Sequence, residues 1–162
     1  PSGTAPALLA FWLLLAGALW WGFAWWEGRQ RAGLEPYQMA GGELVIPRSR
    51  DGHFYVRGEV DHEPVTFLVD TGASAVALTL ADAQRLGIAT DKLDYNYKVV
   101  TASGETRAAA VTLGRVSVAG AALNDVQALV IESGLESSLL GMTYLGRLAS
   151  FEATRSALIL RP

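Results

Sequence analysis

Asp70, Thr71 and Gly72 directly follow the apolar run of residues 65–69, and they are the residues best suited to chemistry in this chain. A carboxylate at the end of an apolar strand is costly to bury unless its pKa shifts or it gains partners. Two carboxylates that share one proton can act together as general acid and general base. Asp70 is therefore a candidate for one half of such a pair, and the chain holds a single triplet of this kind.

The triplet taken alone is also typical of a turn, so a structural role for Asp70 stays open at this point. Gly72 has no side chain, which would let two such loops approach each other closely. None of the other aspartates begins an Asp-Thr-Gly or Asp-Ser-Gly sequence; they are Asp51, Asp61, Asp82, Asp91, Asp94 and Asp125.

The composition excludes several other chemistries. The chain has no cysteine, so disulfides, thiolate metal sites and cysteine nucleophiles are ruled out. Its two histidines, His53 and His62, favour surface positions over a metal site because no further histidine or cysteine accompanies them. The formal net charge of −3 offers no basic face for nucleic acid. We therefore expect no metal, no cofactor and no nucleic-acid partner.

The first 26 residues carry no charged side chain, and residues 7–26 are a continuous stretch of apolar residues and glycine. Twenty residues of helix span roughly 30 Å, the thickness of the hydrocarbon core of a bilayer. Four tryptophans crowd the end of this stretch, as at a membrane interface. We expect a single-pass transmembrane helix within residues 1–26, in preference to a buried core helix or a cleaved signal peptide, and a tether over 27–42.

Residues 43–162 read as one compact all-β domain with one or two short helices. A first helix is expected to begin at the capping residue Thr79 and to end at Gly87. A hairpin is expected with its tip near residues 102–105, and a break at Gly114. The expected strands are 44–47, 54–60, 65–69 (central and buried on both faces), 75–78, 107–118, 126–131 and 138–141, followed by a helix over 142–148 and a hairpin over 149–160.

The surroundings of the triplet carry a resemblance to a known family. It continues as Ala73-Ser74, and an apolar Leu-Leu-Gly sequence occurs further along the chain. With the apolar anchor, the chain resembles the bacterial, membrane-anchored, single-lobe group of retropepsin-like aspartic proteases. The segments that carry the resemblance are 70–74, 101–104, 139–142 and 144–148. It implies a closed, mostly antiparallel β lobe preceded by a transmembrane helix.

The resemblance also implies an activity, the hydrolysis of peptide bonds by water held between two carboxylates about 3 Å apart. Asp70 would be the catalytic carboxylate, supported by Thr71, Gly72 and Ala73. Thr71 would join two paired loops, and Ala73 would lie beneath them. The hydrophobic strand and glycine that cross behind the loop would be Leu139, Leu140 and Gly141. Family members of retroviral origin usually have arginine after that glycine, where this chain has Met142.

Because the chain has one such triplet, the second carboxylate is expected from a second chain, as an isologous homodimer. The hairpin of Thr101, Ala102, Ser103, Gly104 and Glu105 would be a flap that closes over the substrate, although an ordinary exposed hairpin is the alternative from the residues alone.

The arginines that follow the apolar stretch weakly favour a cytoplasmic domain, whereas the resemblance implies the bacterial inner membrane with a periplasmic protease domain. The expected partner is an extended protein segment near the membrane. A non-catalytic, membrane-anchored peptide-binding or scaffold module with the same fold is the alternative function, and self-cleavage within the tether is a third possibility.

Overall fold

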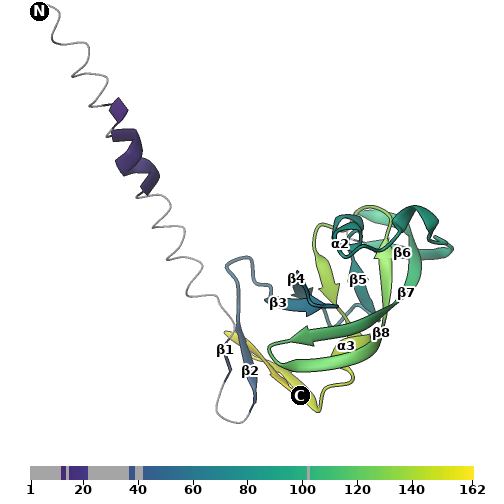
Figure 1. Ribbon diagram of the computed structural model, residues 1–162. Helices are drawn as coiled ribbons and strands as arrows, with labels where there is room; N and C mark the ends of the chain where they lie inside the picture. Colours follow the sequence, from purple (N-terminus) through teal and green to yellow (C-terminus); the bar gives the residue numbers. More distant parts are fainter. Residues whose placement is uncertain (1–11, 14, 22–36, 39–41, 102) are drawn as a thin grey trace, which may run out of the picture. The chain divides into compact units, whose positions relative to one another are not determined.

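The computed structural model describes residues 12–13, 15–21, 37–38, 42–101 and 103–162 (Figure 1). The chain divides into two units, Pro1–Glu35 and Pro36–Pro162. In the first unit, residues 12–13 and 15–21 are helical. Among the described residues there is no helix of the length and apolar character that a membrane crossing requires. The span expected over residues 7–26 lies largely outside the described residues.

The second unit contains two sheets and short helices, which confirms the expected all-β lobe. One sheet has four antiparallel strands in the spatial order β1 (Tyr37–Gln38), β2 (Leu44–Pro47), β11 (Ala157–Arg161) and β10 (Ser150–Ala153). The other has seven strands in the order β3 (Tyr55–Val60), β4 (Glu63–Val69), β9 (Ser138–Leu140), β5 (Val76–Leu78), β8 (Ala121–Ile131), β7 (Gly104–Val118) and β6 (Tyr97–Thr101). The helices are α2 (Leu80–Arg85), the 3-10 turn η1 (Thr90–Lys92) and α3 (Met142–Leu145).

An additional pairing of β3 with β7 curls the larger sheet around a core. Figure 1 shows β7 and β8 as the two long strands of this sheet, and they pair along most of their length. The core is filled by side chains that are almost fully buried from both sheets and from α3, among them Ile46, Phe67, Leu140, Tyr144 and Leu158. Burial raises the pKa of Tyr144 to about 12, and its hydroxyl donates to the carbonyl of Ala121 at 2.7 Å.

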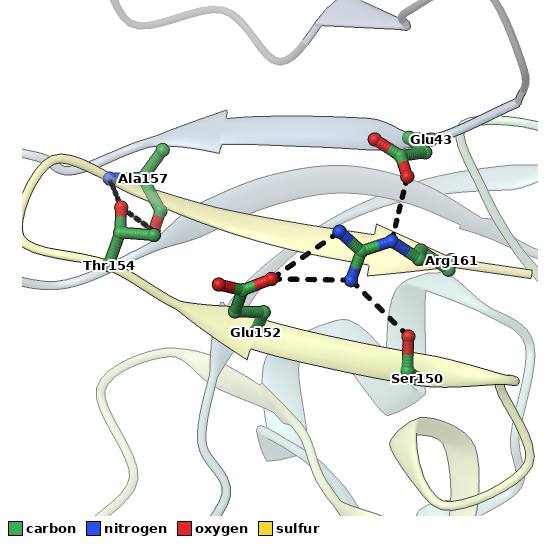
Figure 2. Close-up of polar contacts among 6 residues, drawn as sticks. All are labelled: Glu43, Ser150, Glu152, Thr154, Ala157 and Arg161. Carbon is green, nitrogen blue, oxygen red and sulfur yellow. Dashed lines mark hydrogen bonds and ion pairs between the residues drawn. The ribbon is translucent and has the colours of Figure 1, made fainter.

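Local chemistry accounts for the ends of the predicted elements. The Thr79 hydroxyl accepts the N–H of Asp82 at 3.0 Å and caps α2, and Gly87 follows its end with φ of +77°, as expected. The closing hairpin turns at Thr154, whose hydroxyl accepts the N–H of Ala157 at 3.0 Å (Figure 2).

The smaller sheet is held across its strands by Arg161 of β11. Figure 2 shows its guanidinium lying between two carboxylates: Nε donates to Glu43 at 2.7 Å, and Nη2 lies 3.4 Å from Glu152. Tyr37 and Gln38, which fall within the segment expected to be a tether, pair with β2 as strand β1. The sheet is thus built from strands of a single chain.

Two expectations about strands are wrong in detail. Only one face of β4 is fully buried: Val65 and Phe67 point into the core, whereas Thr66 is exposed and Leu68 lines a cavity. Gly114 does not break β7, which runs through it. A side chain there would meet the Asp61 carboxylate at 2.7 Å, because that carboxylate accepts the N–H of Arg115.

Candidate active site

The loop of residues 70–75, here called the Asp70 loop, begins where β4 ends. The Asp70 N–H donates to the carbonyl of Leu140 at 3.3 Å, and the Asp70 carbonyl accepts the N–H of Ala73 at 3.2 Å. The carboxylate itself accepts the N–H of Gly72 at 2.8 Å through Oδ1. The loop therefore folds back on its own first residue, and main-chain hydrogen bonds orient the half-buried Asp70 side chain.

Strand β9 lies between β4 and β5, directly behind this loop. It pairs parallel with β4, so that Leu68 is opposite Leu139 and Val69 opposite Leu140, and antiparallel with β5 at Ala77. The chain leaves β9 through Gly141, where a Cβ atom would lie 2.1 Å from the carbonyl oxygen of Ala75. Only glycine fits at this crossing.

Thr143, two residues after Gly141, holds the chain in place where it crosses behind the Asp70 loop. The sequence did not reveal this role. The Thr143 hydroxyl accepts the N–H of Val76 at 2.9 Å and donates to the carbonyl of Gln127 at 2.7 Å. The N–H of Met142 donates to the carbonyl of Ala73 at 2.9 Å. Helix α3 is thereby joined to the Asp70 loop, β5 and β8.

Ser138 begins β9, as expected, and is fully buried. Its hydroxyl accepts the N–H of Thr79 at 3.1 Å and donates to the Asp82 carboxylate at 2.5 Å. Arg85 also contacts that carboxylate at 2.5 Å. Burial raises the pKa of Asp82, but the hydrogen bonds from Ser138, Arg85 and Thr79 outweigh it and hold the pKa below the ordinary value of 3.8.

The Asp70 loop forms one wall of a cavity of about 670 Å³. Asp70, Gly72 and Ala73 line it, as do Thr101 and Ser103 of the expected hairpin and Leu139 of β9. The cavity therefore brings together six of the residues predicted from the sequence. Thr71, Gly104, Glu105, Leu140 and Gly141 lie outside its lining, and Ala102 lies outside the described residues.

The expected hairpin is present as β6, a tight tip and the start of β7; we call residues 97–108 the β6–β7 hairpin. Thr101 is paired with Gly104, and its hydroxyl donates to the Gly104 carbonyl at 3.0 Å and accepts the N–H of Ser103 at 3.2 Å. At its base, Arg107 makes a two-pronged contact with Glu132, at 2.9 and 2.7 Å. Val99 and Val100 line the cavity beside the tip.

Among the lining residues that the sequence did not assign to the site, three have titratable side chains: His53, Tyr55 and Glu136. The Tyr55 hydroxyl donates to the Asp51 carboxylate at 2.9 Å. That hydrogen bond raises the pKa of Tyr55, with smaller contributions from burial and from the charges of Asp51 and Glu136. These residues lie on a turn, a strand start and a loop that are distant in sequence from Asp70, so no local pattern marks them.

Within the part of the chain that the structure describes, no three histidine, cysteine, aspartate or glutamate side chains are grouped so as to hold a metal ion.

Comparison with known proteins agrees with this geometry. The family described as "gag-polyprotein putative aspartyl protease" matches residues 56–147. A retropepsin-like aspartic protease from Rickettsia conorii, solved as a crystal structure, is 44% identical with a TM-score of 0.69, covering 74% of this chain and 98% of that one. The EIAV protease, solved with an inhibitor, shares the fold at 18% identity and a TM-score of 0.52, covering 65% of this chain and 97% of that one.

Two relatives known from sequence are an uncharacterized protein of Rickettsia prowazekii (strain Madrid E), 44% identical over 119 residues, and one from Sinorhizobium sp encoded in the cobV 5′ region, 37% identical over 120 residues. Each alignment covers 74% of this chain, and the chain spans about half the length of these relatives, 51% and 52%. The family match over more than half of the chain and the near-complete coverage of the Rickettsia conorii structure lead to one conclusion: the chain belongs to the retropepsin-like aspartic protease family.

Proposed function

We propose that this protein is a membrane-tethered aspartic endopeptidase that hydrolyses extended protein segments as a homodimer. The observation that carries the proposal is the Asp70 carboxylate, held by the N–H of Gly72 on the wall of a cavity large enough for side chains of a peptide. Family membership supports aspartic protease chemistry for a carboxylate in this position.

Among the described residues, no second aspartate lines the cavity beside Asp70. The other acidic residue on the cavity wall, among the described residues, is Glu136. Ser138, the first residue of β9, is opposite Phe67, which precedes Asp70 by three positions, and Glu136 lies in the bend before β9. At about 3.3 Å per residue, three positions along β4 are roughly 10 Å, far beyond the ~3 Å over which carboxylates share a proton.

A second copy of the chain supplies the missing group in the simplest way, with the Asp70 carboxylates meeting on a two-fold axis. Thr71 and Gly72 are exposed at the tip of the Asp70 loop, which leaves them free to contact the partner loop. One carboxylate stays protonated and polarises the peptide carbonyl, while the other takes a proton from the attacking water. Ala73, Leu139, Leu140 and Gly141 support the loop, and residues 101–105 serve as the flap.

We assign membrane attachment to residues 7–26 and the protease domain to residues 43–162 on the periplasmic side of a bacterial inner membrane. The apolar, tryptophan-rich composition of residues 7–26 supports attachment. A reporter enzyme fused after residue 162 is expected to be active only when it is exported; activity confined to the cytoplasm would refute the periplasmic assignment.

The activity is tested by comparing wild type, Asp70→Asn and Asp91→Asn on a library of extended peptides. Asp91 is an exposed aspartate of η1 outside the cavity, so its variant is the matched control. Cleavage is expected from wild type and the control, with at least a thousand-fold loss in Asp70→Asn. Equal cleavage by all three proteins would refute the role of Asp70. Peptide binding without any cleavage would favour the non-catalytic binding module.

The homodimer is tested separately by co-expressing wild-type and Asp70→Asn chains in equal amounts. If each site needs two Asp70 side chains, random pairing leaves about a quarter of the dimers fully active, whereas independent monomers would keep about half of the activity.

A further inference from the structure

The charged side chains of the cavity are unevenly distributed. Asp70 and Glu136 line it together with His53, and neither lysine nor arginine is among its lining residues in the described chain. The remaining walls are apolar, with Val99, Leu129, Ile131 and Leu139 among them, or carry small polar groups. A peptide in this cavity therefore meets an apolar surface with a negative charge at some distance from the reacting carboxylate.

Glu136 is a free charge in this surface. It is exposed, and it makes no hydrogen bond or ion pair with any described residue. The nearby carboxylate of Glu132 differs, because Arg107 neutralises it through two hydrogen bonds. Asp51 likewise is engaged by the Tyr55 hydroxyl and by the N–H of His53. Glu136 is thus the carboxylate on this rim that is available to a ligand.

Glu136 also stands at the junction of two hollows. Together with Tyr55 and Ser137 it lines both the main cavity and a neighbouring hollow of about 430 Å³. Tyr55 is fixed there by its hydrogen bond to Asp51. A long side chain that leaves the main cavity at this point passes Tyr55 and reaches the Glu136 carboxylate. A lysine or arginine has both the length and the charge for this path.

We propose that Glu136 is a specificity-determining residue that selects substrates with a lysine or arginine side chain some three to five residues from the scissile bond. This inference rests on the proposed function. The position follows from the register of β9, whose first residue Ser138 is opposite Phe67, three residues and roughly 10 Å from Asp70, with Glu136 in the bend that precedes it. In a two-fold dimer each protomer presents its own Glu136, so the preference occurs on both sides of the cleaved bond.

A positive charge on the neighbouring hollow limits the size of the effect. Arg57 lines that hollow and makes no hydrogen bond or ion pair with the described residues, whereas Arg85 is paired with Asp82. Arg57 therefore repels a cationic side chain that approaches Glu136. The pair formed with the substrate is solvent-exposed, and exposed pairs change an equilibrium by about three-fold at moderate ionic strength.

The test measures binding first, on the full chain carrying Asp70→Asn so that no peptide is cut. Fluorescently labelled decapeptides of one apolar sequence are compared with lysine or glutamine placed at each position in turn. The expected result is about three-fold tighter binding of the lysine peptides at positions three to five from the centre. This advantage is lost in Glu136→Gln, reversed in Glu136→Lys, and kept in Glu63→Gln, which alters an exposed carboxylate outside both hollows.

A lysine advantage that persists in Glu136→Gln, or the absence of any lysine advantage, would overturn the inference. The same peptides are then offered to the chain with Asp70 intact, with and without Glu136→Gln. Failure of that chain to cut any peptide, with the binding preference present, would refute the endopeptidase and leave the role of Glu136 standing. Cleavage without a Glu136-dependent preference would refute the role of Glu136 and leave the endopeptidase standing.

Discussion

The support behind Asp70 and the β6–β7 hairpin share one cavity but are built in opposite ways. Behind Asp70, Leu140 is fully buried, Gly141 has no room for a methyl group, and Thr143 ties three elements together. On the hairpin, Val100 is 81% exposed and β6 is the last strand of its sheet. The support is held by packing, main-chain hydrogen bonds and the Thr143 hydroxyl. At the hairpin tip, the side-chain hydrogen bonds among the described residues are those of the Thr101 hydroxyl.

The difference separates two requirements of catalysis. A carboxylate that must meet its partner within hydrogen-bond distance needs surroundings that do not move. A segment that admits an extended peptide must open and close, and such segments come from the least stable parts of a fold. Variants behind Asp70 should therefore change the stability of the whole domain, and variants of the hairpin should change local opening.

The largest effect is expected from paired glycine substitutions in the two regions. Gly141→Ala places a methyl group 2.1 Å from the Ala75 carbonyl oxygen and should lower the free energy of unfolding by about 3 kcal/mol or more. Gly104→Ala meets open space and bears only the strain of its positive φ, about 1 kcal/mol. Thermal and urea unfolding measure both, and equal losses would contradict the contrast.

A second prediction concerns the Thr143 hydroxyl. Thr143→Val keeps the shape of the side chain but leaves the Val76 N–H and the Gln127 carbonyl without a partner, which should cost about 2 kcal/mol of unfolding free energy. Thr143→Ser keeps the hydroxyl and is the matched control, with a smaller loss. If the two variants were equally destabilised, packing of the methyl group and not the hydrogen bonds would account for the effect.

A third prediction uses pH to probe the buried network at Ser138. Because the pKa of Asp82 is lower in the folded protein than its ordinary 3.8, the carboxylate stabilises the fold above that pH, and this contribution is lost as the pH falls below it towards the folded-state pKa. Wild type should lose unfolding free energy on acidification below about pH 4, and Asp82→Asn should lose less. Denaturant titrations at a series of pH values between neutral and acidic measure the unfolding free energy of both proteins. If the unfolding free energy fell equally with pH in both, Asp82 would not be the cause of the acid sensitivity.

The smallest effect is expected at the base of the β6–β7 hairpin. Arg107 and Glu132 form an exposed pair, with side chains 62% and 37% accessible, so Arg107→Gln should change global stability by about 0.5 kcal/mol or less. Amide hydrogen exchange over residues 97–106 should nevertheless become faster. The exchanged pair Arg107→Glu with Glu132→Arg should restore protection, and protection unaffected by Arg107→Gln would show that the pair does not hold the hairpin.

Local patterns were enough to predict many elements from the sequence. Strand β2 has the predicted bounds, α2 begins at its predicted capping residue, and the hairpin near 102–105 is present. Each depends on residues a few positions apart, as in the Thr79 cap. The position of Asp70 at the end of a strand followed from the same kind of pattern, since an apolar run ended at a charged residue.

The parts that the sequence could not predict depend on contacts between distant residues. Thr143 bonds Val76 across 67 positions, and Ser138 bonds Thr79 across 59, so neither residue carries a local sign of its role. Gly114 was predicted to break its strand because a glycine is typical of a break. The sequence does not show that the Asp61 carboxylate, from another hairpin, occupies the space that a side chain at position 114 would need. Glu136 was likewise overlooked, since only the folded chain brings its loop to the cavity.

The four-stranded sheet secured by Arg161 has a consequence for regulation. Its four strands come from one chain, and its outer strands, β1 and β10, each have one edge that pairs with no other described strand. In the proposed enzyme, these free edges are open to a second chain, and association of the two chains is governed by mass action. Catalytic output and melting temperature should both rise with the number of chains in a patch of membrane, because association stabilises the folded state, so that crowding turns the protease on and dilution turns it off.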